Sequence, residues 1–355
     1  MNDIIMAAYP MKGITIRKAL AACFGAMAIL LVSIEAEAGA TLDRVRSKKV
    51  LRCGVSEGLT GFSIQDQSGR WIGMDTDFCR AVAAAVGPGV KVEFVPLTAS
   101  ARFVALKMGK IDLLTRSTTW TLGREAFLGV QFAGVLYFDW QAFMVTRKSG
   151  INRASQLKGA TVCVRKGTTT EMNLADYSKD KALKLKPLVL DTQAEAEQAL
   201  QSGRCKAYTS DHSILASERL SAPGGAGEYV ILPEKLSKEP TGPVVRRGDE
   251  EWFRLVKWVL FALIEAEERG VTRENASLLK KTAKDPAVRR LLGAEGGFGK
   301  ALGTDNDWAL RAIQATGNYG EMYERNLGRQ SALNLDRGFN RLETKGGLMW
   351  APPFR

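Results

Sequence analysis

The sequence predicts an α/β protein made of two lobes with similar topology. Short apolar strands alternate with amphipathic helices over residues 50–269, the pattern of α/β domains. The segment 105–115 recurs as 199–209, with Ala, Leu, Gly, a basic residue and Thr at the same positions. A chain of 355 residues is long enough for two domains. We therefore expect two sheets whose strand ends face a shared cleft.

The elements of the first half are delimited by acidic residues and glycines. Asp75, Thr76 and Asp77 predict the start of a helix that ends at Gly87. Gly109 ends a second helix. The expected strands are 50–55, 91–95 and 111–114, and the expected helices are 75–86 and 101–108.

The second half has the same order of elements. Thr168 and Glu171 have capping-box spacing, which predicts the start of a helix. Thr192 and Glu195 repeat that spacing, and their helix is expected to end at Gly203. The expected strands are 160–164, 188–190 and 205–208.

Two chain crossings define the predicted domains. The extended aromatic segment 137–145 leads from the first lobe to the second, and 240–243 marks the return. Lobe 1 is then 41–139 plus 240–275, and lobe 2 is 140–239. A C-terminal extension, 276–355, is expected to pack on the lobes and to be helical to about Asn326.

Residues 1–38 have the features of a secretory signal peptide. Basic residues precede an apolar run at 19–32 that is too short to span a bilayer, and 36–38 fits a small-x-small cleavage site. We therefore expect an exported protein. The four cysteines beyond this segment then favour two disulfides.

The bulk composition argues against nucleic-acid and metal partners. The net charge is +12, but Lys and Arg are dispersed along the chain, so we expect a solvated basic surface and no nucleic-acid partner. His212 is the one histidine and the sequence has no CxxC, so we expect no metal and no cofactor.

The stretch 111–125 carries the first candidate site. An apolar strand opens into hydroxyl residues that include Ser117 and Thr119, and the stretch closes on Arg124. Ligands bind at the carboxyl ends of strands in open α/β sheets. A guanidinium with nearby hydroxyl donors suits a small carboxylate. The alternative interpretation is a Thr-rich surface loop with an exposed Arg.

The second half offers complementary groups. Thr169 lies at a predicted helix start, where free backbone amides bind anions. In the repeat, Asp211 occupies the position of Ser117. One cation, several hydroxyls and one carboxylate suit a zwitterion, with its carboxylate on Arg124 and its ammonium on Asp211. The alternatives are that Thr169 lies beside a simple cap and that Asp211 is a turn residue.

The sequence does not favour an enzyme. It contains no GxSxG motif and no P-loop, and its one histidine has no Ser/His/Asp spacing. Acid–base chemistry would require a pair of carboxylates in the cleft, and the sequence does not indicate one.

Several motifs resemble those of one protein family. They are Cys53–Val55, Gly61–Ser63, Trp71–Asp77, Ser117–Arg124, Gly167–Glu171 and Lys345–Pro353. The chain resembles the periplasmic solute-binding proteins of polar amino-acid ABC transporters (solute-binding protein family 3), and within them the general L-amino-acid-binding subfamily. The resemblance implies a two-lobed Venus-flytrap fold of type II that closes on one amino acid.

The resemblance also implies roles for residues. It assigns the ligand carboxylate to Arg124 and the ammonium to Asp211. The hydroxyl donors are Ser117, Thr119 and Thr169. Phe62, in the motif Gly61–Ser63, is also expected to be a ligand-binding residue. Ser117 stands where this subfamily is expected to have Asn. Leu59 replaces the aromatic residue of narrow-specificity relatives, which fits broad specificity.

The resemblance also implies a role in amino-acid transport. The resemblance predicts a monomeric periplasmic protein that binds L-amino acids and delivers them to an inner-membrane ABC permease. The alternatives are a lyase or dehydratase on the same two-lobed fold and a chemosensory binding subunit.

Within two such lobes we predict the disulfides Cys53–Cys79 and Cys163–Cys205. Cys53 lies on the first strand, and Cys79 lies on the helix beside it. Cys163 and Cys205 lie on strands that a doubly wound order makes neighbours, at a spacing that suits a disulfide.

Overall fold

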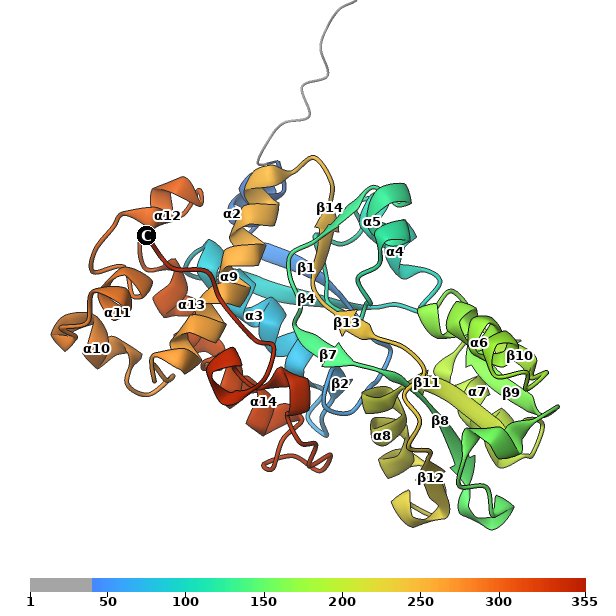
Figure 1. Ribbon diagram of the computed structural model, residues 1–355. Helices are drawn as coiled ribbons and strands as arrows, with labels where there is room; N and C mark the ends of the chain where they lie inside the picture. The colour runs from blue at the N-terminus through green and yellow to red at the C-terminus, as the bar shows by residue number, and fades with distance from the viewer. Residues whose placement is uncertain (1–39) are drawn as a thin grey trace, which may run out of the picture. The chain divides into compact units, whose positions relative to one another are not determined.

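A computed structural model describes residues 40–355, so the predicted signal peptide at 1–38 lies outside the described residues. The first sheet has the strand order β4-β1-β5-β14-β6. Figure 1 labels β1, β4 and β14 of this sheet. Its strands are β1 (Val50–Val55), β4 (Lys91–Pro96), β5 (Leu113–Leu114), β6 (Val130–Phe132) and β14 (Val244–Arg246). β1 pairs in parallel with β4 and β5, whereas β14 is antiparallel to both of its neighbours.

Helices cover both faces of this sheet. The larger core packs β1 against α3 (Met74–Val86) and α9 (Glu250–Glu268), through residues such as Phe78, Val82, Val256 and Leu260. A smaller core on the other face joins Leu106 of α4 (Arg102–Lys107) to β5, β6 and β14. α3 and α4 correspond to the helices predicted at 75–86 and 101–108, and α3 and α9 each bury one apolar face.

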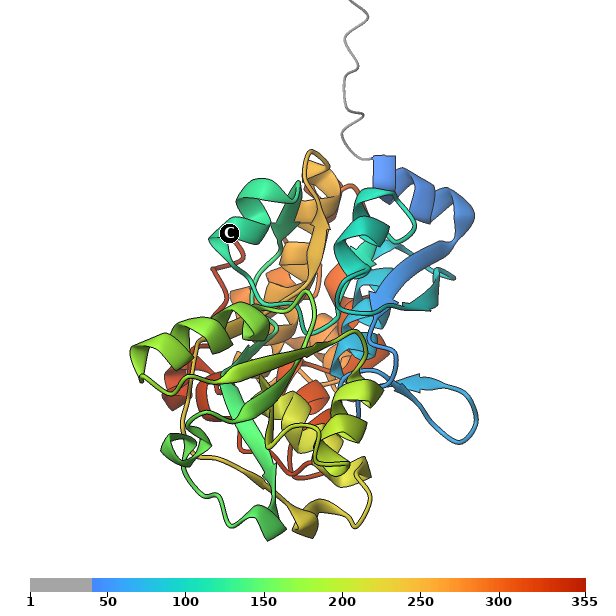
Figure 2. The same cartoon turned by 90° about the vertical axis from the view of Figure 1, so that its right-hand side faces the viewer.

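The second sheet has the order β10-β9-β11-β8-β12. Its strands are labelled in Figure 1, and Figure 2 shows the same cartoon turned by 90°. Its strands are β8 (Gln141–Thr146), β9 (Thr161–Arg165), β10 (Lys186–Leu190), β11 (Ala207–Asp211) and β12 (Tyr229–Ile231). One face packs on α7 (Gln193–Gln201) and α8 (His212–Ser221), and the other on α6 (Thr169–Asp180). Thr168 caps α6, and Thr192 and Glu195 form the predicted capping box of α7.

A two-stranded sheet links the two halves. β7 (Tyr137–Asp139) pairs antiparallel with β13 (Glu239–Thr241), at the two predicted crossings. The fold class predicted from the sequence, an α/β protein with two lobes, is confirmed. The exact domain boundaries stay a prediction.

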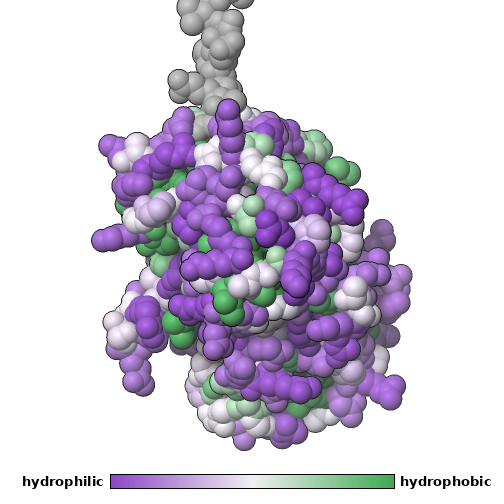
Figure 3. Space-filling model, turned by 90° about the vertical axis from the view of Figure 1, so that its left-hand side faces the viewer, coloured by the Kyte–Doolittle hydropathy of each residue, from purple (hydrophilic) through white to green (hydrophobic). Residues whose placement is uncertain are grey.

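The C-terminal extension contains α10 (Ala276–Thr282), α11 (Pro286–Leu291), α12 (Phe298–Ala301), α13 (Trp308–Thr316) and α14 (Tyr319–Asn326). α13 and α14 pack on α3 and α9 of the first half. Asp77 of α3 accepts hydrogen bonds from Arg325 (2.6 Å) and Asn326 (2.8 Å). The surface on this side is mostly hydrophilic, with small and separate hydrophobic patches (Figure 3). Within residues 40–355, no helix has the length and apolar character needed to cross a membrane.

The last part of the extension reaches the crossing strand β7. The side-chain amide of Asn340, in the 3-10 turn η4 (Gly338–Asn340), accepts from the Phe138 backbone N–H (2.7 Å) and donates to the Phe138 carbonyl (3.0 Å). The Tyr319 hydroxyl donates to the Leu136 carbonyl (2.9 Å). β7 is therefore bonded along both of its edges.

Three predicted strands differ from the structure by two residues or more at an end. The strand expected at 188–190 begins at Lys186. The strand expected at 205–208 instead spans Ala207–Asp211, because Thr209, Ser210 and Asp211 pair antiparallel with β8. The strand expected at 111–114 is limited to Leu113–Leu114. The last two differences arise from pairing with segments that are distant in the sequence, which local patterns do not report.

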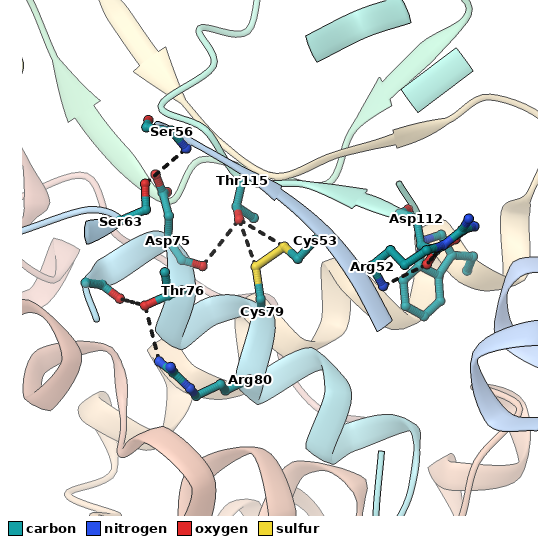
Figure 4. Close-up of a disulfide and its surroundings, with 12 residues drawn as sticks. Arg52, Cys53, Ser56, Ser63, Asp75, Thr76, Cys79, Arg80, Asp112 and Thr115 are labelled. Carbon is teal, nitrogen blue, oxygen red and sulfur yellow. Dashed lines mark hydrogen bonds and ion pairs between the residues drawn. A yellow bond between two sulfur atoms is a disulfide. The ribbon is translucent and has the colours of Figure 1, made fainter. Parts of the chain in front are cut away.

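Both predicted disulfides are present. Cys53 of β1 is bonded to Cys79 of α3, with a Cα–Cα distance of 6.3 Å, and the Thr115 hydroxyl lies against both sulfurs (Figure 4). Cys163 of β9 is bonded to Cys205, which lies just before the neighbouring strand β11, at 5.7 Å. Each disulfide therefore lies within one sheet–helix unit.

We predict that both disulfides stabilise the fold. The double variant Cys163→Ser/Cys205→Ser should lose about 2–4 kcal/mol of unfolding free energy, because the cross-link restricts the unfolded chain. Cys53→Ser/Cys79→Ser should lose slightly less, since its residues are 26 rather than 42 apart in the sequence. Urea unfolding with and without reductant measures both losses. Unchanged stability in either double variant would contradict the prediction for that disulfide.

Candidate ligand-binding site

A narrow, polar cavity lies between the two halves of the protein. Its walls come from the carboxyl ends of β1, β5, β9 and β11 and from adjacent helix starts, as expected for an α/β sheet. The lining residues are Ser56, Leu59, Arg102, Arg116, Ser117, Thr119, Arg124, Arg165, Thr168, Thr169, Thr170, Ser210, Asp211 and Ile214. Five of the six site residues proposed from the sequence therefore meet in one cavity.

Arg124 is held in the cavity wall by local structure. It lies on α5 (Leu122–Phe127), whose first turn is capped by Thr121. Its Nη1 donates to the Thr119 carbonyl (2.7 Å), and its guanidinium lies 5.4 Å from the Phe103 ring centroid. Burial lowers the pKa of Arg124, whereas the nearby carboxylates Glu239 and Asp211 oppose that change. The fixed guanidinium can grip a carboxylate without much loss of side-chain freedom.

Asp211 presents a free acceptor on the opposite wall. It is buried at the end of β11, and its Oδ1 has no hydrogen-bond partner among residues 40–355. Burial raises the pKa of Asp211 well above its usual range, and the neighbouring Glu239 and Asp139 raise it further, against Arg165 and Arg124. A buried acceptor without a donor is costly, so a ligand that brings an N–H cation would stabilise it.

Ser117 adopts an unusual backbone conformation. Its φ is +38°, in the left-handed region that residues with a side chain rarely occupy. Its hydroxyl lies 3.5 Å from Asp75 Oδ2, at the start of α3. Asn tolerates this region better than Ser, which gives a physical reason for the Asn that the resemblance leads us to expect at this position.

The cavity contains more positive charge than the sequence analysis expected. We expected one cation, but Arg102, Arg116 and Arg165 line the cavity together with Arg124. Arg116 and Arg165 each lie at the carboxyl end of a strand, β5 and β9, so the strand-end rule could have identified them. Arg102 begins α4, and we find no local signal in the sequence that marks it.

These three arginines are fixed by few protein contacts. Arg116 Nε donates to the Leu97 carbonyl (2.6 Å), and Arg165 Nη2 donates to Ser210 Oγ (3.3 Å). Burial, with Arg165 nearby, lowers the pKa of Arg116 to about 9. Burial lowers the pKa of Arg102 well below its usual range, and Arg124 adds to this. Buried guanidiniums that lie this close together favour an anionic ligand.

Phe62 does not line the cavity. It is 2% exposed and packs in the core of the first half, where its ring meets Tyr137 edge-on at 5.6 Å. The structure therefore does not bring Phe62 to the other proposed site residues. Its backbone carbonyl accepts from the Asp75 N–H (3.0 Å), so it supports the start of α3.

The comparison with protein families matches this architecture. The family model of the bacterial extracellular solute-binding proteins, family 3, matches residues 51–275. The chain belongs to this family. The matched region contains both sheets and all residues that line the cavity, whereas most of the C-terminal extension follows it.

Three relatives match this solute-binding protein over almost its whole length. The glutamate/glutamine/aspartate/asparagine-binding protein BztA of Rhodobacter capsulatus is 48% identical over 94% of this chain and 99% of its own. The general L-amino acid-binding periplasmic protein AapJ of Rhizobium johnstonii is 47% identical over 95% and 99%. A solved ABC-transporter periplasmic binding protein from Brucella ovis with glutathione bound is 47% identical, has a TM-score of 0.86, and covers 89% of this chain and 99% of its own.

We predict that Ser117→Asn stabilises the solute-binding protein without ligand. The gain in unfolding free energy should be a few tenths to about 1 kcal/mol, because Asn relieves part of the left-handed backbone strain. Ser117→Val is the matched opposite, since a β-branched residue should lower the unfolding free energy. Urea unfolding of the three proteins tests this order, and an Asn variant less stable than the Val variant would contradict it.

Proposed function

We propose that this protein is the solute-binding component of an amino-acid ABC transporter and that it binds L-amino acids with broad specificity. One observation carries the proposal: Arg124 and Asp211, from opposite halves of the chain, line the same cavity. The guanidinium suits the ligand's α-carboxylate. The unpartnered Asp211 Oδ1 suits its α-ammonium. Because every α-amino acid has both groups, this clamp accepts many side chains.

The additional arginines bear on which amino acids bind best. With one carboxylate and four guanidinium groups in its walls, the cavity suits ligands with a second carboxylate or an amide oxygen. The names of BztA and of the Brucella ovis structure support this, since glutamate, glutamine and glutathione share an α-amino-carboxylate end and further oxygen acceptors. We therefore infer a preference for acidic and amide amino acids within a broad range.

The rest of the proposal follows the transport role. The protein would act in the periplasm as a monomer without catalysis and would deliver its ligand to an inner-membrane permease. The two sheets joined through β7 and β13 are suited to hinge closure around the ligand. The relatives named for amino-acid binding support this role over the lyase and chemosensory alternatives.

We predict that Arg124→Ala weakens the binding of all accepted amino acids. Losing a charge-assisted contact should reduce affinity by about tenfold to a hundredfold. The loss should be similar for L-glutamate, L-arginine and L-alanine, because all three share the α-carboxylate. Calorimetric titration of this panel measures the losses, and in the wild type L-glutamate should bind tightest.

Arg329→Ala is the matched control, since it removes an exposed arginine of the extension that does not line the cavity. It should leave all affinities unchanged. Wild-type affinity of Arg124→Ala for the whole panel, or a loss for one amino acid alone, would show that Arg124 does not hold the shared carboxylate.

A further inference from the structure

Glu239 is a buried carboxylate beside the cavity, and no local pattern in the sequence marks it. It lies on the crossing strand β13, and its side chain is 1% exposed. Four side chains bond to it: Thr119 (2.6 Å) and Thr169 (2.8 Å) at Oε2, and Asn173 (2.8 Å) and Ser237 (2.6 Å) at Oε1. Its capacity as an acceptor is therefore used within the protein.

The bonds to Thr119 and Thr169 connect three separate parts of the chain. Thr119 follows β5 in the first half and forms an isolated β-bridge with Thr241. Thr169 is the first residue of α6 in the second half. Both hydroxyls line the cavity, and their oxygens lie 3.2 Å apart. Glu239 thus joins the two walls of the site through one carboxylate oxygen.

Counting protons fixes the direction of these bonds. A threonine hydroxyl has one proton to donate and two lone pairs with which to accept. A carboxylate is a stronger acceptor than another hydroxyl. Both protons therefore point at Glu239 Oε2, and the lone pairs of both oxygens are left for the cavity.

We propose that Glu239 is a positioning residue that turns Thr119 and Thr169 into acceptors for the ligand's α-ammonium. This rests on the proposed function. An α-ammonium has three N–H donors, and the two hydroxyl oxygens with Asp211 Oδ1 provide three acceptors in the same cavity. The sequence led us to expect that the hydroxyls of Thr119 and Thr169 donate to the ligand's α-carboxylate. In this proposal they instead accept from its α-ammonium.

The test compares each amino acid with the analogue that lacks the ammonium. The probes are L-glutamate with L-2-hydroxyglutarate and L-alanine with L-lactate, with the weaker ligand measured by competition. A hydroxy acid keeps the carboxylate but brings one donor in place of three. The ratio of the two affinities therefore reports on how the protein recognises the ammonium, its charge included, and a general structural defect would not change it.

Glu239→Met removes the acceptor for both hydroxyls at similar side-chain length. Their protons can then turn into the cavity, and the ratio should fall by about tenfold, as for one lost contact to a charged group. Glu239→Gln is the conservative control. Its amide oxygen can face the two hydroxyls while its nitrogen donates to a turned Asn173, so the ratio should be largely retained. An unchanged ratio in the Met variant, or an equal fall in both variants, would overturn the proposal.

A second pair of variants covers the case in which Glu239→Met does not fold. Thr169→Val removes the hydroxyl, and Thr169→Ser keeps it. Thr169→Val should weaken amino-acid binding by about tenfold and hydroxy-acid binding much less, and Thr169→Ser should preserve the ratio. Equal losses for both ligands would show that the hydroxyl donates to the carboxylate instead. A wild-type protein that binds no amino acid of the panel would refute the proposed function itself.

Discussion

The pairing of β7 with β13 is the contact on which the site depends. Three residue pairs, from Tyr137 with Thr241 to Asp139 with Glu239, bring together segments that are about a hundred residues apart. This pairing places Glu239 between the hydroxyls of Thr119 and Thr169 and places Asp139 near Asp211. The pairing of β7 with β13 therefore helps to position both walls of the cavity. The register of this pairing determines where Glu239 and Asp139 lie relative to the ligand-binding residues.

The second constraint is the cost of charge in a closed cavity. Four guanidiniums and Asp211 line the same narrow cavity, and several of their polar atoms, including Arg102 Nε, Arg165 Nε and Asp211 Oδ1, have no partner within residues 40–355. Such groups are destabilising when no ligand is bound, because buried polar groups without partners lose their hydration. A ligand with opposite charges at matching positions removes that cost. The same unpartnered atoms can thus contribute to ligand affinity and, without a ligand, reduce the stability of this conformation.

Local sequence patterns predicted the parts of the site that lie at the ends of repeated elements. Arg124, Thr119 and Ser117 follow one copy of the repeat, and Asp211 follows the other, so strand-end reasoning brought them together. Glu239 could not be found in this way. Its place depends on a strand pairing between distant segments, and a glutamate before a proline reads locally as an exposed turn residue. The extension of β11 to Asp211 was missed for the same reason, since its partner β8 lies far away in the sequence.

The Asn340 amide on Phe138 has a mechanical consequence. Asn340 belongs to the extension, whose helices α13 and α14 pack on α3 and α9, so this contact fastens the free edge of β7 to the first lobe. A strand held on both edges cannot change its torsions without breaking bonds on either side. In this crossing, a rotation of the second lobe would therefore bend the chain beyond Asp139, around the start of β8. The extension thereby restricts the backbone torsions of this crossing to a shorter segment.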